Sequence, residues 1–540
     1  VEKLFKTTST VDAEASSATI RNGETSDAPN KNGMPKILQR LATVPDIKRD
    51  TSGITTQYIA TGIVNLGAFA SGVCVAWSSS ALPMLLSDDL ESPSPTRDVM
   101  VESTTPTILR RTETKIELEP FQAAWVASLL CLGALCGAVP TGLISQYFGR
   151  KKTLLYLALP LVVSWILVAS SPNVYGYYVG RFVGGIAVGA FSVGTPPYIE
   201  DIAEKQILST LANFYHVQFS CGILFGYIVG IIENTTWVTV LCASIPIVFF
   251  VAFIFLPESP AYLLSQGKFH EAKAALRYFR GIDNDIDSEI KALREHLRNS
   301  AKQKVTFKEL FTTRATVKAL IVSFGLMIFQ QMSGIYAVLF NARKIFEDSA
   351  PSLNPPSAAI ILGFCFVSST YFSTMLLKMV RRRVLLLISF SAMAVSLGGL
   401  AIYYNLQVSK LSANNTWIPL VTLCVFVIVY ACGAGPIPWL MLREIFPPNA
   451  TRRATAITAG LHWFFAFGVT KLYQNLEEMV RLGWTLWHFA VTCIIAAIFV
   501  YFFVPETKGR TLQEIQNEFE GIHKKKRHRH VIEVESVSEA

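Results

Sequence analysis

The chain has 540 residues, of which 51% are hydrophobic and 16% are charged, and its mean hydropathy is +0.39. Soluble proteins carry charge on about a quarter of their residues, so this composition excludes an ordinary soluble protein. The net charge of +9 comes largely from loops and from the basic segment HKKKRHRH at 523–530, and it does not indicate nucleic acid as a partner. The composition predicts a membrane protein.

The first 57 residues are expected to form a disordered, cytosolic N-terminal tail (1–57). They are polar and rich in Ser and Thr, and segments of this kind cannot bury enough apolar surface to fold. They also lack the short apolar core that is typical of a secretory signal peptide.

Twelve apolar segments follow the tail, and about 20 residues suffice to cross a bilayer as a helix. The sequence therefore predicts an all-α membrane protein with twelve transmembrane helices in two six-helix halves. The expected spans are 58–80, 121–144, 153–171, 175–198, 208–231, 236–256, 316–341, 356–378, 384–406, 417–442, 454–475 and 484–504.

These spans divide the chain into an N-terminal bundle (58–256) and a C-terminal bundle (316–504). Between them, residues 257–315 read as a cytosolic helical linker, with amphipathic helices expected near 268–279 and 288–299. Residues 505–540 are expected to form a basic cytosolic tail, either solvated or in contact with anionic lipid headgroups.

The orientation follows from the distribution of basic residues. With both termini in the cytosol, 38 of the 48 Lys and Arg residues fall on the cytosolic side, as expected for a multi-pass protein of the cell membrane. Two glycosylation sequons, at Asn234 (NTT) and Asn414 (NNT), then lie in outside loops. The nine cysteines all fall within the expected spans, so no disulfide framework is predicted.

Two short motifs occur once in each half and indicate an internal duplication. GRKKTLL (149–155) is echoed by RRRVLLL (381–387), and PESPAYLL (257–264) is echoed by PETKGRTL (505–512). Parallel halves of this kind characterise one class of transporter, in which the substrate binds between them at mid-membrane. A nucleotide-binding glycine loop, a metal-binding cluster and a nucleophile–base constellation are not found, so neither an enzyme nor a cofactor is expected.

Several motifs in a fixed order carry a family resemblance over roughly residues 58–520. They are GVCVAWSSSALP (72–83), GRKK (149–152), GRFVGGIAVG (180–189), PESP (257–260), QQMSGIYAV (330–338), GPIPWLMLREIFP (435–447) and PETKG (505–509). Together they resemble the sugar porter branch of the major facilitator superfamily, most closely the insect facilitated trehalose transporters and more distantly the mammalian glucose facilitators. The resemblance implies a sugar as substrate.

Two glutamines within an apolar span are the leading candidates for sugar binding. At 100° per residue, Gln330 shares one helical face with Ser333, Gly334, Ala337 and Asn341, with Gln331 at its edge. A polar stripe inside a span faces protein or water rather than lipid. The resemblance implies that both glutamines bond to sugar hydroxyls and that Trp439 packs on the sugar ring. Hydrogen bonds between helices are the alternative.

Other positions that bind sugar in the family have changed here. The positions that correspond to polar family residues are Tyr336, His216, Phe366, His462 and Ala466. One neutral hydrogen bond contributes about 0.5–1.5 kcal/mol, whereas a millimolar site has about 4 kcal/mol in total. Losing three or four partners could therefore erase glucose affinity. Tyr336, His216, His462 and Asn341 can still donate or accept, so a different polyol or a disaccharide remains open.

A second set of residues is expected to control access to the site. The resemblance implies that charged groups at the cytosolic ends of spans form ion pairs between the halves; these are Arg150, Arg181, Asp201, Arg382, Arg383 and Glu444. Membrane-end anchoring is the alternative reading. The set departs from the family at Gln146, Lys378 and Arg381, which predicts either a weaker latch or one rebuilt with Lys205, Arg443, Arg452 or Arg453.

Two prolines predict a bend in the tenth span. Pro436 and Pro438 remove two backbone donors within three residues. A bendable helix beside the site suits a gate.

The expected activity is passive transport of a sugar such as trehalose or a hexose by alternating access. Proton-coupled relatives carry an acidic residue in the first span, whereas residues 51–87 contain no Asp or Glu. The alternative for coupling is His216 or His462, because imidazole titrates near neutral pH. The alternatives for function are a non-transporting sugar receptor on the same fold and a facilitator of a less polar solute.

Overall fold

The computed structural model describes residues 51–86, 118–232, 234–281, 285–302, 311–349, 353–408 and 417–521. Throughout these ranges the chain is helical, apart from turns and one isolated bridge between Leu86 and Leu118. The tail over 1–50, the basic segment 523–530 and the sequon at Asn414 lie outside the described residues. Helix begins at Thr51, so residues 51–57 are helical and do not belong to the tail in which they were expected.

The first half contains six successive helical segments. Each corresponds in position to one expected span, with two of them broken into two helices. They are α3 (Thr51–Val64) with α4 (Leu66–Leu85), α5 (Pro120–Tyr147), α6 (Arg150–Tyr156) with α7 (Ala158–Ser170), α8 (Val174–Ile202), α9 (Leu208–Val229) and α10 (Thr235–Phe253).

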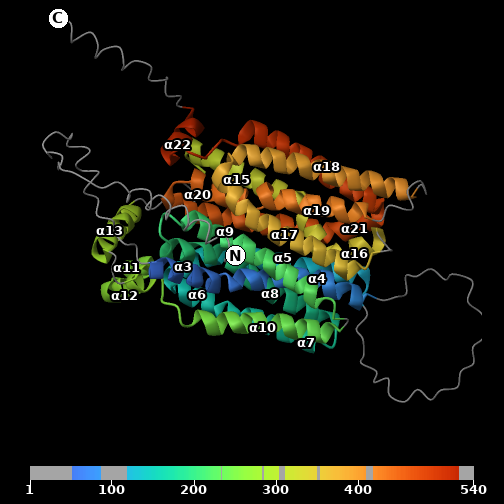
Figure 1. The fold of residues 1–540 in the computed structure, drawn as a ribbon, viewed down its shortest axis with the longest axis horizontal. Coiled ribbons are helices and arrows are strands. Elements are labelled where there is room, and N and C mark those ends of the chain that lie inside the picture. Colours follow the sequence, from blue (N-terminus) through green and yellow to red (C-terminus); the bar gives the residue numbers. More distant parts are fainter. Residues whose placement is uncertain are drawn as a thin grey trace, which may run out of the picture. The chain divides into compact units, whose positions relative to one another are not determined.

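The second half repeats this pattern with more interruptions. Its helices are α15 (Arg314–Met332), α16 (Ile335–Ser349), α17 (Pro355–Met379), α18 (Arg382–Val408), α19 (Ile418–Val429), the π-helical turn η2 (Tyr430–Ala434), α20 (Ile437–Ile445), α21 (Pro448–Phe503) and α22 (Leu512–Glu520). In Figure 1 the helices of the first half, drawn blue to green, pack side by side against those of the second half, drawn yellow to red.

Ten helical segments of the described chain are long and apolar enough to cross a membrane. The two expected spans that are not among them lie in α9 and in the first part of α21. The 56 residues of α21 do not form one straight rod, because Glu444 and Thr507, which flank it, are hydrogen-bonded to each other. For these two segments the count of twelve stays a prediction.

Close packing of α5 on α8 depends on glycines. A Cβ atom added at Gly185 would lie 2.2 Å from the carbonyl oxygen of Leu130, and one added at Gly189 would lie 1.9 Å from that of Ala134. Residues without a side chain therefore let the two backbones touch, as small residues commonly do between membrane helices. The GG–x–x–x–G pattern of α8 is therefore a packing face.

The two repeated motifs meet in space within each half. Glu258 of PESP accepts a hydrogen bond from the backbone N–H of Lys151 at the start of α6 (2.7 Å). Glu506 of PETKG accepts one from the backbone N–H of Arg382 at the start of α18 (3.0 Å). In both halves a carboxylate thus satisfies the unpaired donors at a helix N-terminus, where the helix dipole favours negative charge. The motifs that are repeated in the sequence therefore form the same contact in each half.

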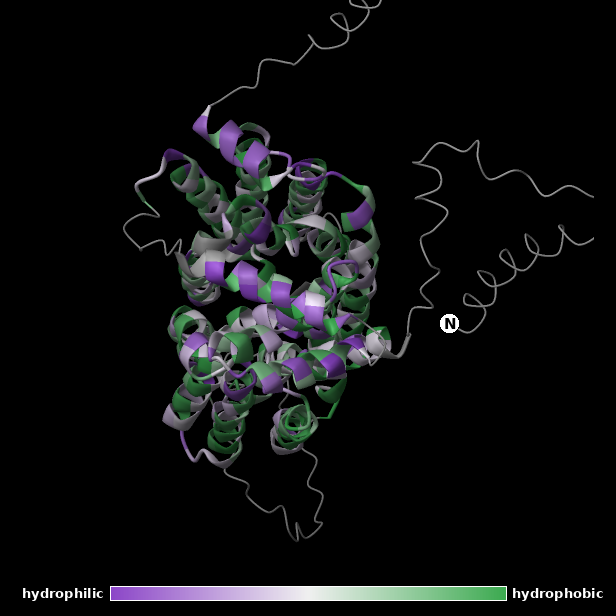
Figure 2. Cartoon of the chain, turned by 90° about the vertical axis from the view of Figure 1, so that its left-hand side faces the viewer, coloured by the Kyte–Doolittle hydropathy of each residue, from purple (hydrophilic) through white to green (hydrophobic). Residues whose placement is uncertain are grey.

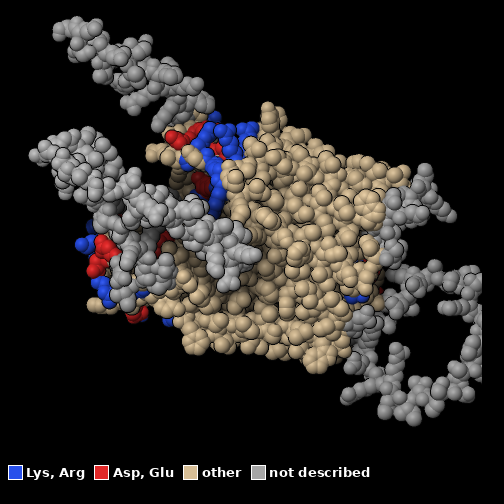
Figure 3. Space-filling view, viewed as in Figure 1, with Lys and Arg blue, Asp and Glu red and all other residues tan. Residues whose placement is uncertain are grey.

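The linker forms short helices that lie together at one end of the bundle. They are α11 (Pro260–Ser265), α12 (Phe269–Arg280) and α13 (Ile286–Lys302), the last two being the amphipathic helices expected from the sequence. Hydrophilic residues follow the outer sides of these helices and of α22 (Figure 2). On the face shown in Figure 3, charged side chains gather at this end while the flank of the bundle is free of them. We call this the linker end.

Candidate functional site

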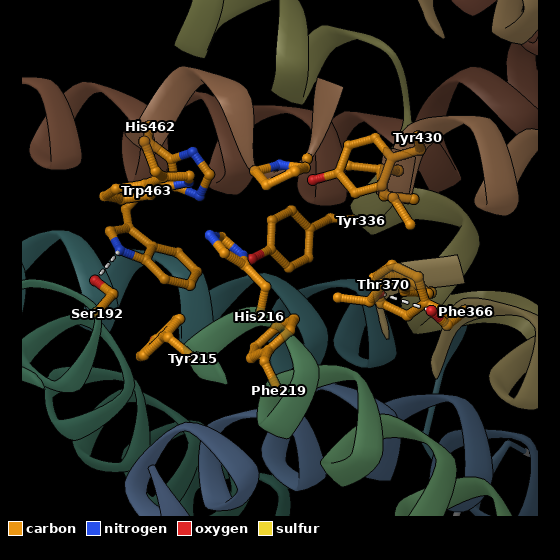
Figure 4. A pocket seen from close by; sticks show the side chains of 16 residues that line it. Ser192, Tyr215, His216, Phe219, Tyr336, Phe366, Thr370, Tyr430, His462 and Trp463 are labelled. Atoms are coloured by element: carbon orange, nitrogen blue, oxygen red, sulfur yellow. Dashed lines mark hydrogen bonds between the residues drawn. The ribbon is translucent and has the colours of Figure 1, made fainter. Parts of the chain in front are cut away.

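A cavity lies where the two halves face each other, with a volume of about 60 Å³. That volume holds several water molecules. The first half contributes residues from α8 and α9, and the second half contributes residues from α16, α17, η2, α20 and α21 (Figure 4). Its lining residues are Ser192, Tyr215, His216, Phe219, Ile335, Tyr336, Leu339, Phe366, Thr370, Tyr430, Ala431, Gly435, Pro436, Trp439, His462 and Trp463.

The polypeptide is broken beside the cavity between α15 and α16. Gly334 has φ +83, a left-handed conformation that suits glycine, and a Cβ there would lie 2.5 Å from the ring of Phe489. The expectation of one continuous helical face from Gln330 to Asn341 is therefore wrong. Gln330 and Gln331 lie in the last turn of α15, whereas Tyr336 and Asn341 belong to α16, which starts at Ile335.

The tenth span is also broken, as its prolines predicted. Helix α19 ends at Val429, a π-helical turn follows, and α20 starts at Ile437 with Pro436 as its N-cap. Because Pro436 and Pro438 have no N–H group, the break leaves fewer donors unpaired than it otherwise would. Pro436 lines the cavity, while Pro438 is buried beside it.

Aromatic rings make up most of the cavity wall. His462 is at the centre of one group, with its ring centroid 5.0 Å from that of Trp439, 5.1 Å from Trp463 and 6.1 Å from Tyr336. Ring pairs at these separations attract each other beyond the area that they bury. On the facing side, the labelled side chains of Tyr215, His216 and Phe219 rise from α9 into the same space (Figure 4).

Gln330 and Gln331 lie behind this wall rather than in it. Both are buried, and neither is among the lining residues. Gln330 Nε2 donates to the carbonyl oxygens of Ala434 (2.7 Å) and Gly435 (2.8 Å), so it ties α15 to the π-helical turn. The Oε1 atoms of both glutamines are buried without a hydrogen-bond partner among the described residues. An unsatisfied buried acceptor costs about 1–3 kcal/mol, so each of these two oxygens has an unused capacity to accept a hydrogen bond.

Gln331 is paired with His462. Its Nε2 lies 2.9 Å from Nδ1 and 3.1 Å from Nε2 of the histidine ring. A neutral imidazole has one nitrogen that accepts, so one of the two contacts is the hydrogen bond. Of the eight residues predicted to bind substrate, five line the cavity: Tyr336, His216, Phe366, Trp439 and His462.

The side chain of Asn341, which was also predicted to bind substrate, forms a hydrogen bond within its own helix. Its Nδ2 donates to the carbonyl oxygen of Ala337 (2.9 Å), and its backbone departs from helical geometry (φ −121, ψ 18). It is not among the lining residues. The geometry therefore gives Asn341 the role of a kink residue in α16.

The predicted latch is built differently from the expectation. Arg150 pairs with Asp201 within the first half, and Arg382 pairs with Glu444 (3.3 Å) within the second half. Arg383 packs on Tyr501, with its guanidinium 5.5 Å from the ring centroid, again within the second half. The ion pairs of Arg150 and Arg382 were expected to join the halves, and in this structure each lies within one half. Asp201 also interacts electrostatically with Arg452 of the second half.

An ion pair between described residues of the two halves uses Arg443, one of the substitutes considered from the sequence. Its Nη1 lies 2.6 Å from Oε1 of Glu200 on α8. Asn213 of α9 adds a hydrogen bond to Thr374 of α17 (2.6 Å). Both contacts lie near the linker end, and neither Glu200 nor Asn213 was identified from the sequence.

Arg181 is not at the end of its span where the latch was expected. It lies in the part of α8 remote from Asp201, and its side chain is 2% exposed. It donates to the carbonyl oxygens of Cys74 (2.7 Å) and Val126 (3.2 Å) and to Ser78, and its guanidinium lies 5.2 Å from the centre of the Trp77 ring. Arg181 therefore joins α8 to α4 and α5 inside the first half and takes no part in a latch.

The halves also touch at the end remote from the linker. Lys471 Nζ of α21 lies 4.2 Å and 4.4 Å from the ring centroids of Phe121 and Trp125 on α5. The backbone N–H of Arg343 donates to Ser79 Oγ (3.0 Å). Contacts between the halves are thus present on both sides of the cavity.

Several cavity residues were not found from the sequence. Phe219 lies three residues after His216, so helical spacing could have identified it. Tyr215 and Trp463 are the immediate neighbours of His216 and His462, and helical spacing does not predict that they share a face with them. Tyr430 and Thr370 come from separate spans, and nothing in their local sequence distinguishes them from packing residues. Of the predicted glycosylation sites, Asn234 is half-buried and caps α10, accepting from the backbone N–H groups of Thr236 and Trp237.

Residues 99–519 match the family described as "Sugar (and other) transporter". The chain is 36% identical to the facilitated trehalose transporter Tret1 of Bombyx mori over 76% of this chain and 82% of that protein. It is 32% identical to Tret1 of Polypedilum vanderplanki over 87% and 89%. The xylose transporter XylE from E. coli, in a partially occluded inward-open conformation, superimposes with a TM-score of 0.69 at 22% identity, covering 85% of this chain and 100% of that one. The chain is a member of the sugar transporter family and has the fold of the major facilitator superfamily.

Proposed function

We propose that this protein is a facilitative transporter that moves a sugar, trehalose or a hexose, across the cell membrane by alternating access. The observation that supports this most directly is the cavity between the halves. It receives aromatic side chains from both of them and is backed by the two buried glutamines. Aromatic faces pack on the C–H face of a sugar ring, and unpaired amide oxygens can accept hydrogen bonds from its hydroxyl groups.

Transport is proposed to be passive. The lining residues include no Asp or Glu, and residues 51–87 contain none either. Without a carboxylate in the site, a proton carrier would have to be His216 or His462. Uptake should therefore persist when an uncoupler collapses the proton gradient, and a large loss of accumulation would contradict the uniport proposal.

The proposed orientation puts both termini, the linker end and the Arg443–Glu200 ion pair in the cytosol. It is supported by the excess of Lys and Arg in the segments at that end. Epitope tags at either terminus should then bind antibody only after the cell membrane is permeabilised, and not in intact cells.

The direct test of the function is uptake of radiolabelled sugars in a cell that lacks hexose transporters. Trehalose, glucose, fructose and a polyol are compared, and at least one sugar should be taken up above the level of cells without the protein. Absence of flux for all of them, with the protein at the surface, would contradict the proposal.

Gln331→Ala tests the site within that experiment. We expect sugar uptake to fall to background while the protein stays folded, because the variant removes one buried acceptor and the partner of His462. Gel filtration and surface labelling check the fold. Normal uptake by this variant would contradict the proposal that the sugar binds in this cavity.

A facilitator of a less polar solute is the second candidate, and the aromatic wall favours it. Phe366 and Tyr336 occupy positions where the family has polar groups, and both line the cavity. Uptake of an uncharged aromatic compound, with no sugar flux, would favour this candidate.

A further inference from the structure

The kink in α16 lies inside a helical turn whose two ends both contact the first half. In a regular α-helix the N–H of Arg343 would donate to the C=O of Leu339, four residues earlier, and the non-helical backbone of Asn341 lies between them. Here the N–H of Arg343 donates to Ser79 Oγ of α4 (3.0 Å). The C=O of Leu339 accepts from the hydroxyl group of Tyr227 on α9 (2.8 Å). The donor and the acceptor of one helical turn are thus both bonded to the opposite half.

The surroundings of these two contacts exclude water. Ser79, Tyr227 and Leu339 are each at most 2% exposed. A buried backbone donor or acceptor needs a partner, because leaving it unpaired is strongly unfavourable. If the halves separated at this end, the two backbone groups would lose their partners, and the nearest replacement for each would be the other.

We propose that Ser79 and Tyr227 are positioning residues that keep α16 bent at Asn341 while the halves are closed at the end remote from the linker. When this end opens, the N–H of Arg343 and the C=O of Leu339 pair with each other, and α16 straightens. This rests on the proposed transport by alternating access.

The bend concerns the cavity because α16 supplies part of its wall. Ile335, Tyr336 and Leu339 all line the cavity and lie before the kink. A change at Asn341 therefore alters the direction in which the rest of α16 leaves the cavity. Helix α16 packs on α4 (Figure 1), so this change follows the separation of the halves directly.

Three consecutive serines of α4 show how the contact with α16 is selected. Successive side chains of a helix point about 100° apart. Ser78 Oγ accepts from Arg181, and Ser80 Oγ donates to the carbonyl oxygen of Gly226, both within the first half. The hydroxyl group of Ser79, which points between these two directions, contacts α16 instead.

Asn341 favours the bend from within α16. Its Nδ2 donates to the carbonyl oxygen of Ala337 (2.9 Å), the acceptor that its own backbone N–H would use in a regular helix. Asparagine side chains compete with the backbone in this way and favour non-helical conformations. The bend thus has a local cause, and the contacts with the first half stabilise it.

Spin labels measure how far this end of the full chain is open, in proteoliposomes without sugar. One label is placed at Tyr175, which is 70% exposed at the start of α8, and the other at Lys344 in α16. Tyr227→Phe removes one hydroxyl group and keeps the ring, and Ser79→Ala removes the other hydroxyl group. Each should raise the ratio of open to closed populations by about two- to twelvefold, the effect of one neutral hydrogen bond.

Two hydroxyl deletions within one half are the matched controls. Tyr404→Phe removes a hydroxyl group of α18 that donates to the carbonyl oxygen of Ile345 in α16 (3.4 Å). Ser80→Ala removes the one that donates to Gly226 (3.0 Å). Neither contact joins the halves, so both variants should have the populations of the parent chain.

The double variant, Ser79→Ala with Tyr227→Phe, distinguishes one shared helical bond from two independent contacts. Without either hydroxyl group, the N–H of Arg343 and the C=O of Leu339 can pair in the closed state as well as in the open state. The second substitution should therefore change the ratio by less than about twofold, whereas the effects of independent contacts multiply.

Two results would overturn the proposal: single variants with the populations of the controls, or a double variant whose effect is the product of the single effects. Uptake of labelled sugars by the same proteins tests the transport function separately. If the parent chain moves no sugar while the populations respond as expected, the transport function fails and the role of Ser79 and Tyr227 in holding α16 stands.

Discussion

At the scale of single residues, the important feature of the site is which polar atoms already form hydrogen bonds with other protein groups. Gln330 and Gln331 were predicted to reach the sugar directly, and the structure instead gives each of them a protein partner behind the aromatic wall. Their Oε1 atoms are buried and have no hydrogen-bond partner among the described residues. Trp439 and His462, by contrast, line the cavity in which we propose that the sugar binds.

Trp439→Leu tests the contribution of ring stacking. It should raise the KM for sugar uptake by about two- to twelvefold, because an aromatic contact contributes about 0.5–1.5 kcal/mol beyond its buried area. Kinetics of uptake in proteoliposomes measure the change. Trp417→Leu is the matched control, since Trp417 is 58% exposed at the start of α19 and does not line the cavity. Equal KM values for the two variants would contradict a stacking role for Trp439.

At the scale of elements, glycines and prolines determine how close the helices come and where they break. Helices α5 and α8 touch through Gly185 and Gly189, and α15 stops because Gly334 takes a left-handed conformation. Two of the broken spans, α15–α16 and α19–η2–α20, supply part of the cavity wall. This is expected, because irregular backbone is tolerated at membrane depth where it is buried in protein or lines a cavity.

Gly189→Ala should destabilise the first half. The new methyl group would lie 1.9 Å from the carbonyl oxygen of Ala134, so the two helices must separate. Overpacking of this kind costs about 1–3 kcal/mol, which should appear as a lower melting temperature in detergent and less protein at the surface. Gly399→Ala in α18 is the control, because nothing lies within 4 Å of its added methyl group. A melting temperature equal to that of the parent chain would show that α5 and α8 are not held by this contact.

At the scale of the whole molecule, contacts between the halves are asymmetric. The Arg443–Glu200 ion pair and the Asn213–Thr374 hydrogen bond lie near the linker end. At the opposite end, Lys471 lies against Phe121 and Trp125. Alternating access requires these two groups of contacts to break in turn, so weakening one should favour the state that is open at that end.

Glu200→Gln and Lys471→Met should shift the conformational equilibrium in opposite directions. The ion pair is partly exposed, with 31% and 38% of the two side chains accessible, so its loss should shift the equilibrium by less than about fivefold. Loss of the cation–π contact should shift it by about two- to thirtyfold. Distances between pairs of spin labels at each end report the two populations. Glu518→Gln is the control, because both residues of the Arg510–Glu518 pair follow the C-terminal bundle and the pair does not join the halves. Shifts of the same sign in both variants would contradict the assignment of the two contacts to opposite ends.

The sequence by itself determined the helical class, the two halves, the linker helices and the break at Pro436 and Pro438. These follow from local causes, namely runs of apolar residues, repeated motifs and residues that cannot continue a helix. The family resemblance also identified five residues of the cavity wall. Tyr336 and Trp439 lie within its motifs, whereas His216, Phe366 and His462 were assigned from their positions in the fifth, eighth and eleventh spans.

Only the tertiary structure decided which polar groups meet. Arg181 was expected in a latch and instead joins three helices of one half. The ion pair between the halves came from Glu200 and Arg443, and the partner of Gln331 proved to be His462, 131 residues away. Such pairs depend on the approach of helices that are remote in sequence, and no local pattern of hydropathy or spacing encodes that approach.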